Sequence, residues 1–253
     1  SLPAPLNKKI MIIWIASYPK SGNTYIRSFL ASYFFSENGK FNFDQLLKLH
    51  QFPSMKFSKN RIESEEEASK YWIFNQKTFF DNDELNLVKT HNCLLKFRGN
   101  NFTSKDQTLG AIYIVRDPRN LITSFTHHYS FSYEDALKFM MYDKAALVEK
   151  SADNDYSNFT YLNSWSNHYK SWRDNDQFKT LFIKFEDLED NKDKIFREIV
   201  KFINELNKNS KEVDEKKFIN SINSTTFVNM KNKERNEGFE ESIVSKKTGK
   251  KLN

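Results

Sequence analysis

The chain has 253 residues, 38% of them hydrophobic, and can build either one large α/β domain or two small ones. Cys93 is the only cysteine, which excludes an intrachain disulfide and favours a reducing, cytoplasmic compartment. The formal net charge of +6 favours anionic ligands, and no run approaches the ~18–20 apolar residues of a membrane span. Ser1 and Leu2 leave open whether a native N-terminal targeting segment precedes the chain.

The first predicted element is a strand over residues 11–16. This run is continuously apolar and rich in β-forming residues, as expected of a strand buried on both faces of a parallel sheet. Tyr18 and Pro19 end it. Large apolar residues then recur from Ile26 to Phe34 at spacings of three and four, which predicts a helix with one buried face.

Between this strand and helix lies the loop of residues 20–24, K-S-G-N-T. It offers an ammonium group, two hydroxyls, main-chain N–H groups and the positive end of a helix dipole, which together suit a phosphate-like anion. The alternative is an ordinary tight turn, which also favours Gly, Asn and Ser. The combination of Lys20 with the glycine and hydroxyls favours anion binding.

The middle of the chain alternates helices and strands. Helices are predicted over residues 44–50 and 63–80, the latter opened by Ser64 and an acidic run that suits the helix dipole. Residues 85–91 form a second strand candidate that ends in two functional side chains, Lys89 and His91.

Residues 111–115 are the clearest strand, and Pro118 fits the first position of the helix that follows it. Strand, basic loop and helix therefore occur a second time. The remaining predicted elements are helices over 133–148 and 161–172, a strand over 181–185, a helix through Ile195 and Ile203, and helices over 215–222 and 225–232 with Ser224 as N-cap of the last.

This order predicts an α/β fold, a single domain over residues 1–253 with an open, mainly parallel sheet and helices on both faces. Residues 20–24, Lys89 with His91, and Arg116 with Ser124 then converge on the carboxyl edge of the sheet. Singly, each has a plain structural reading: a surface lysine, a hydrogen-bonded core histidine, a salt-bridged turn or a small helical residue. Their shared placement favours one site.

Five segments carry the most specific signal in the chain. They read YPKSGNTY at 18–25, KTH at 89–91, YIVRDPRNLITS at 113–124, FED at 185–187 and TTFVNM at 225–230. In this order they resemble motifs of the sulfotransferases that use 3′-phosphoadenosine 5′-phosphosulfate (PAPS). These are the phosphosulfate loop YPKSGTTW, the KTH segment with the catalytic histidine, the 3′-phosphate motif, a YED strand end and a TSFxxM segment. The resemblance covers residues 10–230 and implies a P-loop-like sulfotransferase fold.

The resemblance implies a role for each matching residue. The implied PAPS ligands are Lys20, Ser21, Gly22, Asn23 and Thr24 for the 5′-phosphosulfate, Arg116 and Ser124 for the 3′-phosphate, and Tyr25, Phe185, Thr225 and Phe227 for the adenine. His91 would be the general base, Lys20 would neutralise the leaving phosphate, and Lys89 would share charge on the sulfuryl oxygens. The product would be 3′-phosphoadenosine 5′-phosphate, and no metal is expected, because the transferred group carries less charge than a γ-phosphoryl group.

The sequence departs from the family pattern in three places. Tyr25 replaces the usual Trp, and Phe185 replaces the usual Tyr. The family's C-terminal RKGxxGDWK segment has no counterpart, and the chain ends in a basic run that includes Lys246 and Lys251. Either this run partly takes its place or, as we expect, the extreme C-terminal segment is missing.

Two other functions compete with sulfuryl transfer. A P-loop kinase or NTPase shares the architecture, but the Walker pattern GxxxxGK[ST] is absent because Lys20 precedes the glycine. A non-enzymatic binder of polyanions such as nucleic acid fits the net charge, but the basic residues are scattered and balanced by 33 acidic ones. For a sulfotransferase, residues 36–84 and 131–175 would build the acceptor pocket, whose aromatic content suits a phenol, a sugar, a lipid or an amine.

Overall fold

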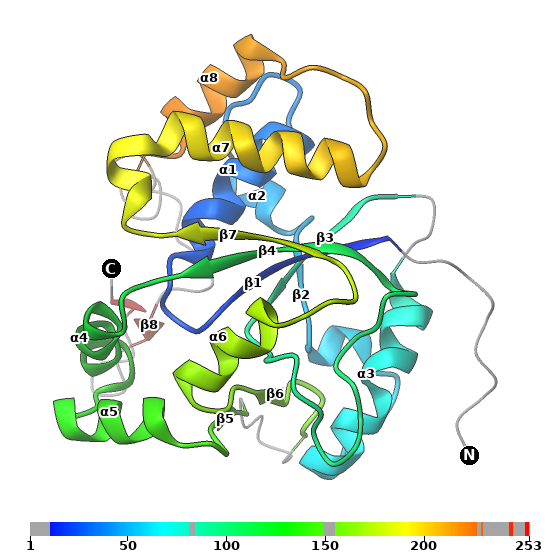
Figure 1. The fold of residues 1–253 in the computed structure, drawn as a ribbon, viewed down its shortest axis with the longest axis vertical. Helices are drawn as coiled ribbons and strands as arrows, with labels where there is room; N and C mark the ends of the chain where they lie inside the picture. The colour runs from blue at the N-terminus through cyan, green and yellow to red at the C-terminus, as the bar shows by residue number, and fades with distance from the viewer. Residues whose placement is uncertain are drawn as a thin grey trace. The chain divides into compact units, whose positions relative to one another are not determined.

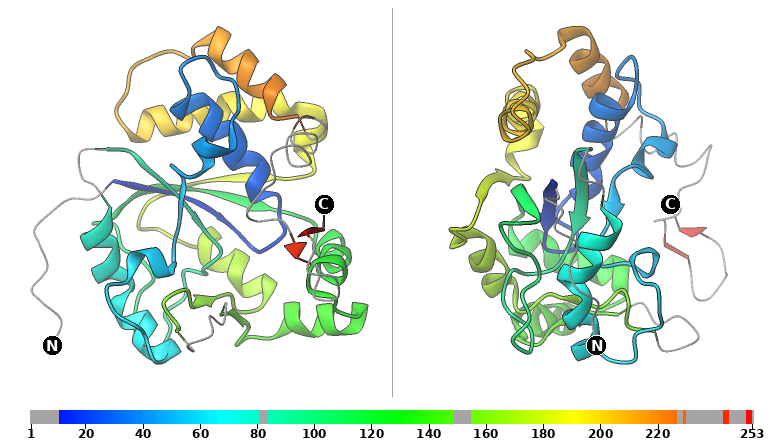
Figure 2. Two further views of the ribbon diagram at one scale, coloured as in Figure 1. Left: turned by 180° about the vertical axis from the view of Figure 1, so that it is seen from behind. Right: turned by 90° about the vertical axis from the view of Figure 1, so that its right-hand side faces the viewer.

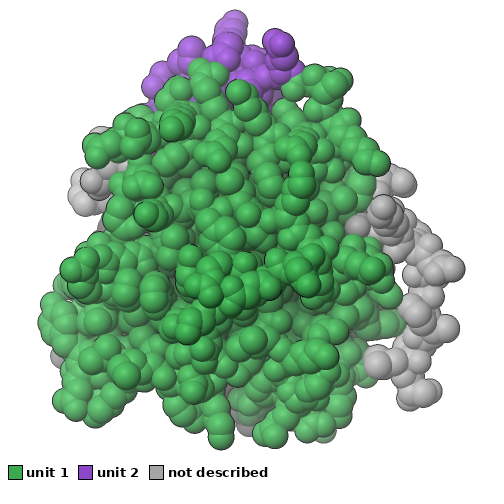
Figure 3. Space-filling model, viewed as in Figure 1, with its two compact units in different colours: residues 1–23, 50–211 green, residues 24–49, 212–253 purple. Residues whose placement is uncertain are grey.

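The computed structural model describes residues 11–80, 84–148 and 155–226, residue 229 and the pairs 243–244 and 251–252. The chain forms two compact units, distinguished by colour in Figure 3. One comprises Ser1–Asn23 with His50–Lys211, and the other Thr24–Leu49 with Glu212–Asn253. Among the described residues, no helix is both long and apolar enough to cross a membrane.

The first unit is built on a five-stranded sheet of order β2-β3-β1-β4-β7 (Figure 1). Every neighbouring pair in it is parallel. The strands are β1 (Ile12–Ser17), β2 (His50–Gln51), β3 (Asn86–Thr90), β4 (Thr108–Val115) and β7 (Lys179–Lys184). All six residues of β1, the central strand, are buried, as its unbroken apolar sequence predicts.

Helices of the first unit cover both faces of this sheet (Figures 1 and 2). Helix α7 (Asp187–Leu206) contacts β4 and β7 from one side, and α3 (Glu65–Phe79) and α6 (Trp165–Arg173) lie on the other. Helices α4 (Pro118–Tyr129) and α5 (Tyr133–Met141) pack together. A short 3-10 helix (Met55–Phe57) and the antiparallel pair β5 (Ala146–Leu147) and β6 (Thr160–Tyr161) complete the unit.

Large aromatic side chains fill the core on the α3 and α6 side of the sheet. Trp14, Trp72 and Trp172 are all fully buried there, one each from β1, α3 and α6. The Trp14 indole N–H donates to the Thr108 hydroxyl at 3.0 Å, so this buried donor is satisfied. Large aromatic residues thus make up much of this core.

The second unit contains α1 from Thr24 onward, α2 (Phe43–Leu46) and α8 (Glu215–Ser224). Helix α1 spans Asn23–Phe35 and begins at the last residue of the first unit. Within the second unit, Phe29 and Tyr33 of α1 pack edge-on against Phe218 of α8. The segments Ile243–Val244 (β8) and Lys251–Leu252 (β9) pair antiparallel.

The α/β class, the parallel sheet and the helices on both faces are confirmed. Ser64 is the N-cap of α3, and Pro118 occupies the first turn of α4, both as predicted. The helix predicted over 44–50 is wrong beyond Leu46, where the chain turns and His50–Gln51 becomes the edge strand β2. Tertiary pairing with β3 overrides the local pattern here.

Three further boundaries differ from prediction. The helix predicted over 133–148 ends at Met141, because residues 146–147 pair with β6. Helix α6 starts only at Trp165, because the Ser164 hydroxyl caps it by accepting from the Asn167 N–H. Ser224 closes α8 and accepts from the Phe41 N–H, so it is not an N-cap, and most of the helix predicted over 225–232 lies outside the described residues.

Candidate active site

The site begins where four neighbouring strands end. Because β3, β1, β4 and β7 are parallel neighbours, the segments that follow them lie at one edge of the sheet (Figure 1). Lys20 follows β1, His91 follows β3, Arg116 follows β4 and Phe185 follows β7. The predicted convergence of the first three strand ends is therefore confirmed, and the fourth joins them.

The loop after β1 has an unusual backbone. Lys20 has a φ of 67° and Gly22 a φ of 87°, both in the left-handed region, which a lysine rarely adopts. The Arg116 guanidinium holds the loop by donating from Nη1 to the Lys20 carbonyl at 2.9 Å. A Cβ on Gly22 would come within 2.1 Å of the Phe185 ring, so glycine is required for space as well as for conformation.

The loop also contains a buried polar atom that suits a ligand. Ser21 is only 1% exposed, and its hydroxyl has no hydrogen-bond partner among the described residues. Buried polar atoms are normally paired, so this hydroxyl near the start of α1 is suited to donate a hydrogen bond to an oxygen atom of a bound ligand. The residues present therefore fit a phosphate-like anion.

The side chain of Asn23 is hydrogen-bonded within the protein. Its amide donates to the Ile15 carbonyl at 3.0 Å and to the Ser17 hydroxyl at 3.2 Å. The side chain thus ties the start of α1 back to the end of β1. A ligand would meet the main-chain N–H of this helix start rather than the amide.

His91 lies beside Ser17, the last residue of β1. Its Nδ1 is 2.8 Å from the Ser17 carbonyl oxygen and 3.3 Å from the Ser17 hydroxyl. A carbonyl can only accept a hydrogen bond, so Nδ1 carries the proton in neutral His91 and Nε2 carries the lone pair. This geometry fixes which nitrogen of the imidazole can take up a proton.

Lys20 contacts a second histidine, His128, which the sequence analysis missed. The Lys20 ammonium lies 3.3 Å from His128 Nδ1, which accepts the hydrogen bond. Burial, and then the charge of Lys20, lower the pKa of His128 and favour its neutral form. His128 is four residues after Ser124 on α4, so helical spacing puts both on the same face. This four-residue step from Ser124 was the feature of the sequence that could have pointed to His128.

Lys89 and Ser124 lie in the elements predicted for them. Lys89 is in β3, two residues before His91, and is only 8% exposed. His91 lies directly after Thr90, the last residue of β3. Ser124 is half-buried in the middle of α4.

Arg116 packs on the ring of Phe185, with its guanidinium carbon 4.8 Å from the ring centroid. Its Nε is buried and has no hydrogen-bond partner among the described residues. Asp117 pairs with Arg119 rather than with Arg116, so the reading as a salt-bridged turn between neighbours is wrong. Glu186 accepts from the Asp117 N–H at 2.9 Å and ties the end of β7 to that of β4.

The other predicted donor ligands belong to the second unit. Thr24 lies in the first turn of α1, and Tyr25 is half-buried there, with its pKa raised by burial. Thr225 is buried after α8, where its hydroxyl donates to the Ser221 carbonyl at 2.7 Å. Phe227 lies outside the described residues.

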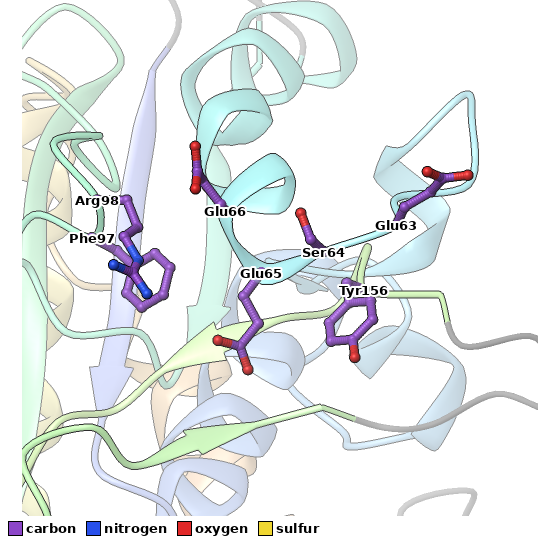
Figure 4. Close-up of a pocket in the computed structure, with 7 residues that line it drawn as sticks. All are labelled: Glu63, Ser64, Glu65, Glu66, Phe97, Arg98 and Tyr156. Carbon is purple, nitrogen blue, oxygen red and sulfur yellow. The ribbon is translucent and has the colours of Figure 1, made fainter.

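A separate pocket of about 300 Å³ lies at the start of α3 (Figure 4). It is lined by residues 63–66, Phe97, Arg98 and Tyr156. Glu66 pairs there with Lys70, and acidic residues are favoured at a helix start, so this cluster has a structural explanation. Within the described part of the chain, no group of three or more His, Cys, Asp or Glu side chains could hold a metal ion.

Comparison with known proteins identifies the family. The family model described as the sulfotransferase domain matches residues 12–252. No curated protein matches the chain significantly. Among solved structures, an uncharacterized protein from Eubacterium ventriosum ATCC 27560 is similar with 15% sequence identity and a TM-score of 0.36, covering 78% of this chain and 99% of that one. Since the family model spans nearly the whole chain, this protein belongs to the sulfotransferase family and is a sulfotransferase.

Proposed function

We propose that this sulfotransferase takes its sulfuryl group from PAPS and transfers it to a hydroxyl or amine, with His91 as general base. The observation that carries this proposal is the 2.8 Å contact between His91 Nδ1 and the Ser17 carbonyl. It leaves the Nε2 lone pair as the basic site of the imidazole. The base stands at the end of β3. The loop of residues 20–24, here called the anion loop, follows the adjacent strand β1.

The anion loop supports a phosphosulfate donor. Lys20 supplies a cation, and Ser21 supplies a buried hydroxyl that has no hydrogen-bond partner in the described part of the chain. Gly22 supplies a main chain that a side chain at this position would push against the Phe185 ring. The start of α1 adds main-chain N–H groups. Together with Thr24, these residues would hold the 5′-phosphosulfate.

Arg116 would anchor the other half of the donor site, which takes the 3′-phosphate and the adenine. The buried Nε of Arg116 offers a donor for a 3′-phosphate, with Ser124 on the adjoining helix. The Phe185 ring offers an apolar surface for an adenine. The resemblance of the sequence motifs also assigns Tyr25, Thr225 and Phe227 to the adenine. The Thr225 hydroxyl already bonds within α8, so it would contribute contact area more than a hydrogen bond.

When bound, PAPS supplies an electrophilic sulfur whose bridging oxygen leaves with the nucleotide. His91 Nε2 takes the proton of the acceptor as its oxygen or nitrogen attacks that sulfur in line. The Lys20 ammonium stabilises the negative charge that grows on the leaving phosphate. Lys89 stabilises the charge on the sulfuryl oxygens. His128, as a neutral acceptor, orients the Lys20 ammonium without competing for its charge.

The donor proposal is tested by transfer from ³⁵S-labelled PAPS to a panel of phenol, hexose, long-chain alcohol and aryl amine, beside γ-labelled ATP with Mg²⁺. We expect the label to be transferred from PAPS and not from ATP. We also expect the protein to bind 3′-phosphoadenosine 5′-phosphate, and Arg116→Ala to weaken this binding. Phosphoryl transfer from ATP without sulfuryl transfer would contradict the proposal. The panel also reports the acceptor class.

A further inference from the structure

A buried histidine, His168 of α6, has no part in the chemistry proposed so far. It is 0% exposed, and both of its ring nitrogens are hydrogen-bonded. Nε2 lies 2.9 Å from the carbonyl oxygen of His91, and Nδ1 lies 2.8 Å from the hydroxyl oxygen of Tyr113. Burying a histidine costs free energy unless both of its ring nitrogens are hydrogen-bonded. Both are bonded here, which raises the question of what these two bonds do.

The partners define the direction of every bond in this chain. The His91 carbonyl can only accept, so His168 Nε2 carries the proton and Nδ1 accepts from the Tyr113 hydroxyl. Tyr113 lies in β4, where it pairs in register with Ala16 of the neighbouring central strand β1. The bonds therefore run from Tyr113 of β4, through His168, to the main chain of the base.

Burial keeps this chain of bonds intact. It lowers the pKa of His168 to about 4, so the imidazole stays neutral and keeps one donor and one acceptor near neutral pH. The ring of Tyr18 packs edge-on against that of His168, with centroids 5.3 Å apart. Packing and hydrogen bonds thus hold His168 in one orientation.

Helix α6 holds the rest of the same loop. The Trp172 indole donates to the Asn92 carbonyl at 3.2 Å, and the Ser171 hydroxyl accepts from the Leu94 N–H at 3.0 Å. Residues 91, 92 and 94 are thus each bonded to a different side chain of one helix turn. His168 is the member that reaches the base itself.

We propose that His168 is a positioning residue, which with Tyr113 of β4 ties the His91 carbonyl to the central sheet and so sets the base relative to the anion loop that follows β1. This inference rests on the proposed role of His91. A displacement of a catalytic group by ~1 Å lowers a rate up to ~100-fold, so a loss of this tie has a measurable effect. His168 itself touches neither donor nor acceptor in this account.

The test compares His168→Gln, whose amide supplies one donor and one acceptor, with His168→Phe, which keeps the bulk and removes both. Tyr113→Phe removes the middle hydroxyl, with Tyr169→Phe, a neighbouring α6 tyrosine, as its control. Val200→Ala, buried in α7, controls for lost stability. Turnover is measured with PAPS and 4-nitrophenol, and as PAPS hydrolysis, in which water takes the acceptor's place.

We expect His168→Phe to lower kcat ~30–100-fold while the Kd for 3′-phosphoadenosine 5′-phosphate changes less than ~3-fold. His168→Gln should stay within ~5-fold of the wild-type kcat, and Tyr113→Phe should lie between the two. In His168→Phe, amide hydrogen exchange should rise in a peptide over residues 91–97 and stay unchanged in strand β3. The Cys93 and Leu94 amides, bonded to the Tyr161 carbonyl and to Ser171, report this opening.

The positioning role would be overturned if His168→Phe had the wild-type kcat or unchanged hydrogen exchange. It would also be overturned if Val200→Ala lost as much kcat as His168→Phe, or if His168→Gln had a kcat as low as that of His168→Phe. His91→Ala, measured in parallel, separates the two proposals. If it abolishes turnover while His168→Phe does not lower it, only the positioning role fails. If it leaves turnover intact, the proposed base is wrong, and the positioning role fails with it.

Discussion

At the scale of single residues, the anion loop depends on two conformations that few side chains tolerate. Lys20 and Gly22 both have positive φ, and the Phe185 ring occupies the space beside Gly22. Strained backbone of this kind persists only where neighbouring groups determine it, and Arg116 does so by bonding the Lys20 carbonyl. Sequence reasoning predicted the residues of the loop but not this support, because it comes from strands far away in the chain.

Replacing the loop lysine tests its electrostatic role. We expect Lys20→Ala to lower kcat ~100–1,000-fold, because an ammonium that stabilises developing charge is lost. The measurement is steady-state turnover of PAPS at saturating donor. Lys138→Ala, which removes an exposed lysine of α5 that pairs with Glu134, is the matched control and should be neutral. Equal kcat in both variants would contradict the assignment of Lys20.

Gly22 makes a purely steric prediction. We expect Gly22→Ala to lower the free energy of unfolding by ~1–3 kcal/mol and to abolish binding of 3′-phosphoadenosine 5′-phosphate, since the new Cβ meets Phe185 at a strained φ. Urea denaturation and calorimetric titration measure the two effects. Adding Phe185→Leu should recover part of the stability by relieving the contact. Undiminished ligand binding by the single variant would contradict the proposed loop.

At the scale of elements, the strongest sequence signals were those with a local physical cause. The buried run of β1, the N-cap of α3 and the proline of α4 all predicted their elements correctly. The two-residue strands β2, β5 and β6 were missed, because so short a strand exists only through its pairing partner. The early end of α5 has the same cause.

The cap of α3 is open to a direct test. The Ser64 hydroxyl accepts from the Glu67 N–H at 3.2 Å, and three glutamates fill the first turn. We expect Ser64→Ala to lower the free energy of unfolding by ~1 kcal/mol and Ser64→Asp to preserve it, because aspartate also caps and suits the helix dipole. Urea denaturation of the two variants measures the difference. Equal stability of the alanine and aspartate variants would contradict the capping role.

At the scale of the whole molecule, the functional groups depend on contacts that no local pattern reveals. The sequence predicted that strand ends bearing Lys20, His91 and Arg116 meet at one edge, and the strand order confirms their adjacency. It missed His128, which contacts Lys20, and it assigned no role to His168 of α6, which bonds to the main chain of His91. Their roles as ligands and base remain predictions. Such bonds between distant elements require the assembled fold.

The buried His168 also makes stability depend on pH. Its pKa is about 4 in the folded protein against an ordinary 6.5, so the unfolded chain binds the proton more readily. Stability is therefore complete above pH ~6.5 and falls as the pH drops towards 4, by up to ~3 kcal/mol from this group. Urea denaturation at pH 7, 5.5 and 4.5 measures the slope, which His168→Gln should reduce. An unchanged slope in that variant would contradict the buried neutral state.

The central claim is that His91 accepts the proton of the acceptor during sulfuryl transfer. The most direct measurement is kcat for ³⁵S transfer from PAPS by the wild type, His91→Ala and the control His50→Gln, an exposed histidine of β2. We expect His91→Ala to lower kcat ~100–10,000-fold, with the donor Kd nearly unchanged and the control near wild type. Wild-type kcat in His91→Ala would contradict it.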